Sequence, residues 1–270
     1  MPGGRDSVLL VFAAKVRRMR GRLAVRAVLA ATVPVGAVLV ATVLAATVLS
    51  GCGAGMPHAS LTTTPVPTPA ESCVSDDEQR LGGVALDVGN GATVQGVVLG
   101  AGGTGIVFAN QAGDTLCTWK GWVGPLLAKG YRALVFDYSG GPADQDVIAG
   151  IDALRRRSVQ KVFLVGASMG ANAVLAAAAQ ARPPVAGVVS LSAHTDISGV
   201  DALAAVRKLT APVFFVAAKD DVTAGADAQR FYDACPSPDK KVDLEVGGLH
   251  GVSLLDDAMS TTIEAFLRNH

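Results

Sequence analysis

The sequence predicts an α/β fold: a mostly parallel sheet of about eight strands with helices on both faces. Three observations predict it. Two alternating runs on either side of Gly89-Asn90-Gly91 are typical of a β-hairpin. After the hairpin, short apolar segments alternate with segments of helical length, a pattern typical of parallel strands joined by crossover helices. In one such pair, a sharp Gly-flanked turn joins the apolar run Val162–Val165 to the small-residue run Ala171–Ala179.

The expected strands are short runs that are either apolar or alternating, and each expected helix fills a longer segment between two strands. The helix that begins at Trp119 ends before Gly130, because glycine is typical of helix ends. The chain shows no internal repeat. Strands are expected over residues 84–88, 93–99, 105–109, 132–137, 162–165, 185–191, 212–217 and 241–246, and helices over 119–129, 146–157, 171–179, 200–209, 224–234 and 252–267.

The turn after Val165 fits the pattern G-x-S-x-G, with Ser168 between Gly166 and Gly170. Because the turn is sharp, a side chain at either glycine position would collide with the neighbouring strand or helix. Ser168 would then begin a helix whose N-terminal N–H groups favour developing negative charge. These features are typical of a nucleophile elbow. The alternative is a glycine-rich turn that only packs.

The first 51 residues predict an export signal. Basic residues between Lys15 and Arg26 precede an uncharged apolar run from Ala27 to Leu49. The next residues, Ser50-Gly51-Cys52, complete a stretch that resembles the lipobox of bacterial lipoproteins. The resemblance implies cleavage before Cys52 and lipidation of that cysteine, with palmitate among the attached chains, on the extracytoplasmic side of the cell membrane. An uncleaved transmembrane anchor is the alternative, since the apolar run is long enough to span a bilayer.

Residues 52–80 predict a tether, because the stretch around Thr62–Pro69 is rich in Pro and Thr and has no periodicity. Residues 81–270 are the expected folded domain. The first 51 residues hold seven Lys or Arg and one acid, which leaves 16 basic and 22 acidic residues in the rest of the chain. This acidic main body argues against nucleic acid as a partner.

The chain has four cysteines, of which Cys52 is assigned to the lipid. An exported domain can hold disulfides. Cys73 lies before the first expected strand and Cys117 near the start of a helix, so we expect these two to pair and Cys235 to stay free. Three reduced thiols are the alternative. The cysteine spacings match no metal site and the four histidines are dispersed, so no metal is expected.

The order of the expected elements and several motifs together resemble the α/β-hydrolase superfamily over about residues 82–268. The resemblance is nearest to compact members without a lid, such as dienelactone-hydrolase-like and carboxylesterase-like proteins. It implies the α/β-hydrolase fold without a large cap domain, and a serine hydrolase that acts on a small-molecule carboxylic ester without a cofactor. Thioesterase and peptidase activities stay open, because the same fold hosts both. The motifs are Gly130–Arg132, Phe136–Gly140, Gly166–Gly170, Pro212–Asp221 and Gly248–Gly251.

The superfamily's chain order of serine, acid and histidine implies a catalytic triad of Ser168, Asp221 and His250. The imidazole would take the proton of the serine hydroxyl, and the carboxylate would orient the ring. Asp220, in the same loop, stays open as the acid, and Asp196 is a remote option.

The other three histidines fit the role of the base less well. His194 follows a strand but precedes the acid, His58 lies in the tether, and His270 ends the chain. His194 stays a candidate for the lining of the site.

The resemblance also implies an oxyanion hole of two backbone N–H groups. Met169 supplies one, and the loop after the third strand supplies the other, from Gln111 or Ala112. Many relatives have His-Gly where this chain has Asn110-Gln111, and Ala218 replaces a glycine before the acid. These departures support the alternative of a decayed hydrolase that serves as a binding or scaffolding module.

Overall fold

The structure is a computed structural model that describes residues 73–270. The predicted export signal, the predicted lipid on Cys52 and the tether up to residue 72 lie outside the described residues. None of the helices in residues 73–270 has the length and apolar character needed to cross a membrane.

An eight-stranded sheet forms the centre of this part of the chain, in the order β1-β2-β4-β3-β5-β6-β9-β10. β2 is antiparallel to both of its neighbours, and every other adjacent pair is parallel. The prediction of a mostly parallel sheet of about eight strands is confirmed. The strands are β1 (Gly83–Gly89), β2 (Ala92–Leu99), β3 (Thr104–Ala109), β4 (Tyr131–Phe136), β5 (Lys161–Ala167), β6 (Gly187–Leu191), β9 (Val213–Ala218) and β10 (Lys240–Glu245).

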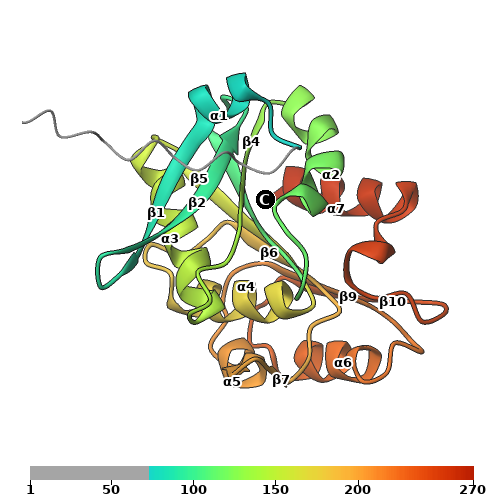
Figure 1. Cartoon of the computed structure of the whole chain (residues 1–270). Coiled ribbons are helices and arrows are strands. Elements are labelled where there is room, and N and C mark those ends of the chain that lie inside the picture. Colours follow the sequence, from blue (N-terminus) through green and yellow to red (C-terminus); the bar gives the residue numbers. More distant parts are fainter. Residues whose placement is uncertain (1–72) are drawn as a thin grey trace, which may run out of the picture. The chain divides into compact units, whose positions relative to one another are not determined.

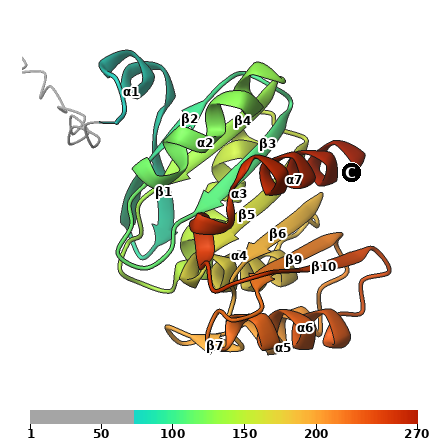
Figure 2. The ribbon, with the colours of Figure 1, turned by 90° about the vertical axis from the view of Figure 1, so that its right-hand side faces the viewer.

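Helices cover both faces of the sheet (Figure 1). Trp119, Ile263 and Phe266 belong to the core on one face, which α2 and α7 cover. Figure 2 looks onto this face, with α2 and α7 in front of the strands. The other face carries a second core with residues from four helices. The helices are α2 (Cys117–Ala128) and α7 (Asp257–Asn269) on the first face, and α3 (Ala143–Arg156), α4 (Met169–Gln180), α5 (Ala202–Val206) and α6 (Ala224–Ala234) on the second.

Two expected helices are shorter in the structure because an aspartate caps each of them at a later residue. The side chain of Asp256 accepts from the Met259 N–H, so α7 begins at Asp257, and the preceding residues form a separate 3-10 turn, η1 (Gly251–Leu254). Asp201 caps α5 in the same way. The residues before α5 pair instead as the short strands β7 (Asp196–Ile197) and β8 (Val200–Asp201).

A helix, α1 (Asp76–Gly82), overlaps the end of the predicted tether, so that prediction is wrong for residues 76–80. Its N-terminus is a capping box in which Ser75 accepts from the Glu78 N–H and the Glu78 carboxylate accepts from the Ser75 N–H. The ion pair of Glu78 with Lys120 links α1 to α2. The disulfide between Cys73 and Cys117 links the residues just before α1 to the start of α2. Cys235 is a buried free thiol.

Candidate active site

Ser168 stands at the junction of β5 and α4 with φ 51° and ψ −116°, a backbone conformation that L-residues rarely adopt. Only glycine fits two positions before the serine and two positions after it. A Cβ on Gly166 would lie 2.3 Å from the carbonyl oxygen of Gly170, and a Cβ on Gly170 would lie 2.2 Å from that of Ala109. The strained turn points to a specific task for the serine, since a turn that only connects elements needs no such strain.

Asp221 and His250 form a hydrogen-bonded pair at the carboxyl edge of the sheet. Nδ1 of His250 lies 2.8 Å from Oδ2 and 3.0 Å from Oδ1 of Asp221. Asp221 is buried in the loop after β9, and His250 is partly exposed in the loop after β10. The neighbouring Asp220 is exposed, and its N–H donates to the Gly247 carbonyl. Of the two candidate acids in this loop, Asp221 is therefore the one that contacts the histidine.

The loop of His250 packs against the elbow of Ser168. A Cβ on Gly251, the residue after the histidine, would lie 3.5 Å from the Cβ of Ala167, the residue before the serine. The Gly251 N–H also donates to the Ser192 hydroxyl at 3.0 Å. In the described part of the chain no hydrogen bond joins the Ser168 hydroxyl to the His250 ring; such bonds are often long before substrate binds. Ser168 itself keeps 7% of its surface accessible, so its neighbours cover most of the residue.

Gln111, one of the two open candidates for the oxyanion hole, has its side chain engaged elsewhere. Its Oε1 accepts from the Val252 N–H at 3.3 Å and lies close to Gly251. The side chain therefore braces the histidine loop against the loop after β3. Asn110 is fully buried and fixes the loop after β3. Its side-chain Nδ2 donates to the Phe136 carbonyl, and its backbone carbonyl accepts from the Tyr138 hydroxyl. Burial raises the pKa of Tyr138, which stays a neutral donor.

The first turn of α4 approaches this loop closely. A Cβ on Gly170 would lie 2.6 Å from the Asn110 carbonyl oxygen. Met169 is the first residue of α4, and its N–H has no carbonyl one turn earlier in the helix to bond to. The first turn of α4 and the loop that begins at Asn110 therefore lie next to each other at this edge of the sheet.

The remaining sequence candidates lie in different places. The His194 ring stacks on the His250 ring, with centroids 5.8 Å apart. His270 bonds to Asp239, on another part of the sheet. Asp196 is an exposed residue of β7, and His58 lies outside the described residues. Within residues 73–270, no group of three or more His, Cys, Asp or Glu side chains is placed to hold a metal ion.

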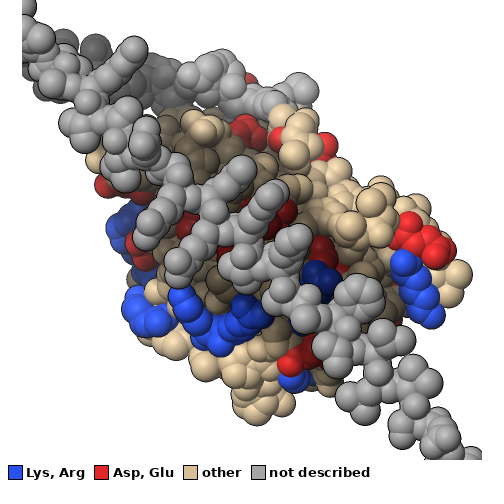
Figure 3. All heavy atoms as spheres, turned by 90° about the horizontal axis from the view of Figure 1, so that it is seen from below, with Lys and Arg blue, Asp and Glu red and all other residues tan. Residues whose placement is uncertain are grey.

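A hollow of about 340 Å³ opens next to His194, with Val222, Thr223 and Asp227 in its wall. Asp227 is buried and pairs with Arg230 at 3.0 Å, so the two charges in the wall balance each other. Charged groups of both signs also occur on the face seen from below in Figure 3.

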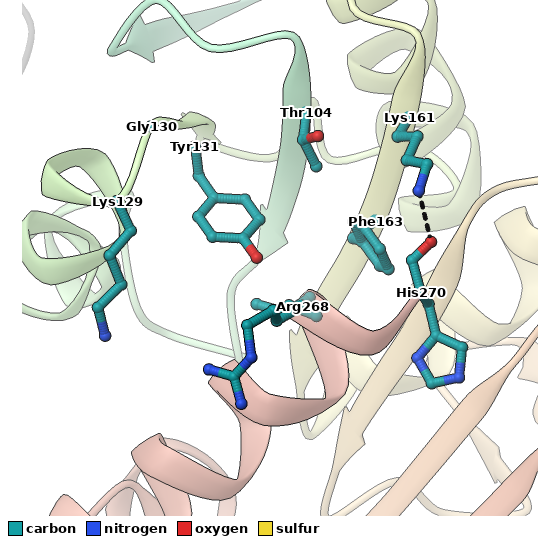
Figure 4. Close-up of a pocket in the computed structure, with 9 residues that line it drawn as sticks. Thr104, Lys129, Gly130, Tyr131, Lys161, Phe163, Arg268 and His270 are labelled. Carbon is teal, nitrogen blue, oxygen red and sulfur yellow. Dashed lines mark hydrogen bonds between the residues drawn. The ribbon is translucent and has the colours of Figure 1, made fainter.

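A second pocket, of about 230 Å³, lies at the amino-terminal ends of β3, β4 and β5 (Figure 4). Ser168 follows the carboxyl end of β5, so this pocket is at the opposite edge of the sheet. Lys161 is occupied there by a 2.8 Å bond to the His270 carbonyl, and Lys129 pairs with Glu264. The pocket is therefore separate from the candidate site at Ser168.

Comparison with protein-family models finds no match for this chain, and comparison with curated protein sequences finds none either. Solved structures do match. An esterase from Pyrococcus furiosus is similar with a TM-score of 0.62 at 15% identity, over 69% of this chain and 89% of that one. A dienelactone hydrolase from Anabaena variabilis gives 0.59 at 18% identity, over 70% and 96%. A monoacylglycerol lipase from Paleococcus ferrophilus gives 0.56 at 14% identity, over 66% and 99%.

Identities of this size carry an argument about architecture only. The TM-scores of 0.56 to 0.62 show that the mostly parallel eight-stranded sheet with helices on both faces is shared with these neighbours as a fold. Residues 73–270 have the α/β-hydrolase fold.

Proposed function

We propose that the protein is a serine hydrolase that cleaves carboxylic esters through an acyl-enzyme. One observation carries the proposal: the hydrogen-bonded pair of Asp221 and His250 lies at the sheet edge where the strained elbow presents Ser168. A serine hydroxyl is a weak nucleophile until a positioned base takes its proton. The similarity to esterases and a lipase in fold supports a hydrolase.

In the proposed acylation, the Ser168 hydroxyl oxygen attacks the ester carbonyl carbon while Nε2 of His250 takes the hydroxyl proton. The carbonyl π electrons move to the oxygen, which becomes an oxyanion. When the intermediate collapses, the bond to the alkoxy oxygen breaks, and the alcohol leaves with the proton from His250. Asp221 holds the Nδ1–H of the ring and stabilises the imidazolium that forms between the two steps.

Deacylation repeats the sequence with water as the nucleophile. His250 takes a proton from the water, the resulting hydroxide attacks the acyl carbon, and Ser168 leaves with the proton. In both halves the N–H of Met169 and an N–H from Gln111 or Ala112 stabilise the oxyanion. The proposed mechanism uses no metal and no organic cofactor.

A fluorophosphonate probe tests this proposal, because it reacts with activated serines. We expect wild-type protein to take up one probe molecule and the Ser168→Ala variant to take up none. Ser75→Ala, at the exposed cap of α1, is the matched control and should label like wild type. Absence of labelling in wild-type protein that is folded by circular dichroism would contradict the proposal and favour a binding module with a decayed site.

We further propose that the protein is exported and held at the extracytoplasmic side of the cell membrane by a lipid on Cys52. The motif before that cysteine supports this part of the proposal. Metabolic labelling of the full chain with a palmitate analogue tests it. Label on wild type that disappears in Cys52→Ala is the expected result, and undiminished label on that variant would overturn it.

A further inference from the structure

The imidazole ring of His194 lies against that of His250, with ring centroids 5.8 Å apart and an angle of 24° between the planes. His194 follows the carboxyl end of β6, whereas His250 follows β10, so loops distant in the sequence bring the rings together. The proposed mechanism gives His194 no step. Planar rings in offset stacking restrict each other's tilt, and orientation is what a catalytic imidazole needs.

The bond to Asp221 alone leaves His250 with freedom to move. The ring is attached to the backbone through Cβ and is bonded to the carboxylate through Nδ1, but small rotations about χ1 and χ2 can still tilt it. The opposite side of the ring, which carries Nε2, moves furthest in such a tilt. The His250 side chain is also 37% exposed, so solvent borders much of it. A second planar group against one ring face supplies the missing constraint.

His194 is itself held at three points. Its Nδ1 lies 2.8 Å from the Thr223 hydroxyl. Its backbone N–H donates to Oδ1 of Asn172 at 3.0 Å, and its carbonyl accepts from Nδ2 of Asn172 at 2.7 Å. Asn172 is fully buried in α4, one turn after Ser168. The position of His194 is therefore set by the same helix that carries the serine.

The charges around His194 are compensated by other groups. Oδ2 of Asp227 is 3.9 Å from Nδ1 of His194, and it accepts the Thr195 N–H at 3.1 Å. Oδ1 of Asp227 accepts from Arg230. The nearest partner of Nδ1 of His194 is thus the neutral hydroxyl of Thr223. The His194 ring contacts the His250 ring by packing.

We propose that His194 is a positioning residue: its ring stacks on His250 and holds it in the orientation in which Nδ1 faces Asp221 and Nε2 faces Ser168. This inference rests on the proposed function, because it takes His250 as the base. The planar ring of His194, rather than its nitrogen atoms, restricts the tilt of the His250 ring.

Steady-state hydrolysis of p-nitrophenyl acetate by the full chain tests the proposal with two substitutions. We expect His194→Ala to lower kcat by about 10- to 100-fold with KM changed less than about twofold, because a small misplacement of a catalytic group is costly. His194→Phe keeps a planar ring and should stay within about threefold of wild type. His270→Ala, whose histidine bonds to Asp239 away from the site, controls for the loss of a histidine. A kcat for His194→Ala equal to wild type, or a His194→Phe variant as slow as His194→Ala, would overturn the proposal.

A nuclear magnetic resonance measurement tests the positioning role of His194 without using enzyme activity. The low-field Nδ1–H resonance of His250, identified by its loss in His250→Asn, should be sharp in wild type and in His194→Phe. It should be broadened or absent in His194→Ala, because a tilting ring exchanges this proton with water. An unchanged resonance in His194→Ala would contradict the proposal. If wild-type protein hydrolysed no ester, the proposed function would fail while this resonance would still test the role of His194.

Discussion

A Cβ atom on Gly170 would lie 2.2 Å from the carbonyl oxygen of Ala109, which means that the first turn of α4 passes directly over the end of β3. This close approach places the N-terminus of the helix beside the loop that holds Gln111. The elbow is thus defined by the packing of backbone on backbone, and any side chain at this point must separate the two.

Gly170→Ala is therefore expected to lower the free energy of unfolding by about 3 kcal/mol or more, because the clash is with backbone that cannot rotate away. Gly121→Ala is the matched control. It lies on the exposed side of α2, where nothing lies within 4 Å of an added Cβ. This control should gain about 0.5–1 kcal/mol from helix propensity. Urea unfolding measures both values, and equal changes in the two variants would contradict this account.

Val222 follows the proposed acid with φ 30°, and 92% of its surface is exposed. A β-branched residue is strained in this conformation and gains no burial in return. Asparagine tolerates positive φ, so we expect Val222→Asn to raise the free energy of unfolding by about 1 kcal/mol.

Val246→Asn controls for the removal of an exposed valine. Val246 is 85% exposed and is not among the residues with positive φ. A change within about 0.5 kcal/mol is expected for this variant in the same thermal or urea titration. Equal stabilisation of both variants would show that backbone strain at residue 222 is not the cause.

Glu78 links α1 to α2. The hydrogen bonds that its carboxylate accepts from Lys120 and from the Ser75 N–H hold its pKa below the usual value of 4.5. A carboxyl group with a lowered pKa in the folded state stabilises the fold above its unfolded pKa. That contribution is lost as the pH falls through the folded pKa. Glu78→Gln should therefore be less stable than wild type near neutral pH, and the difference should shrink as the pH falls below 4.5. A difference that stays constant from pH 7 to pH 3 would show that charge is not the cause.

The disulfide between Cys73 and Cys117 closes a loop with a sequence separation of 44 residues. Loop-closure entropy gives it a stabilising effect of up to about 4 kcal/mol. The double variant Cys73→Ala/Cys117→Ala should unfold at a lower urea concentration than the oxidised wild type. In the presence of a reductant the two proteins should converge. Identical midpoints without reductant would mean that the bond does not form in solution.

Local signals in the sequence were sufficient for most of the fold. The spacing of Gly166 and Gly170 around the serine predicts the elbow because both glycines are needed within one turn. The runs of apolar residues predict the strands because β5, β6 and β9 are buried almost throughout. The sequence also contains a local signal for α1, because Ser75 and Glu78 have the spacing of a capping box. The Pro/Thr-rich segment before them favours a tether instead, and the tether was predicted.

Several contacts between distant loops have no local signal in the sequence. The resemblance favours Asp221 as the acid but leaves Asp220 open, and the fold of their loop shows that Asp221 is the one that turns inward to His250. The stacking of His194 on His250 depends on the juxtaposition of β6, β9 and β10. The Gln111 side chain likewise reaches Val252 across 141 positions of sequence, a contact with no local signal.

The measurement that tests the central claim most directly is the rate of fluorophosphonate reaction with Ser168 in two neighbouring variants. If the pair of Asp221 and His250 activates Ser168, Asp221→Asn should slow the reaction by roughly 10³- to 10⁴-fold, because the ring then loses its orienting acceptor. Asp220→Asn, one position earlier and exposed, should react within about twofold of wild type, as a surface substitution outside the machinery should. A wild-type rate in Asp221→Asn, or an equal loss in both variants, would contradict the account.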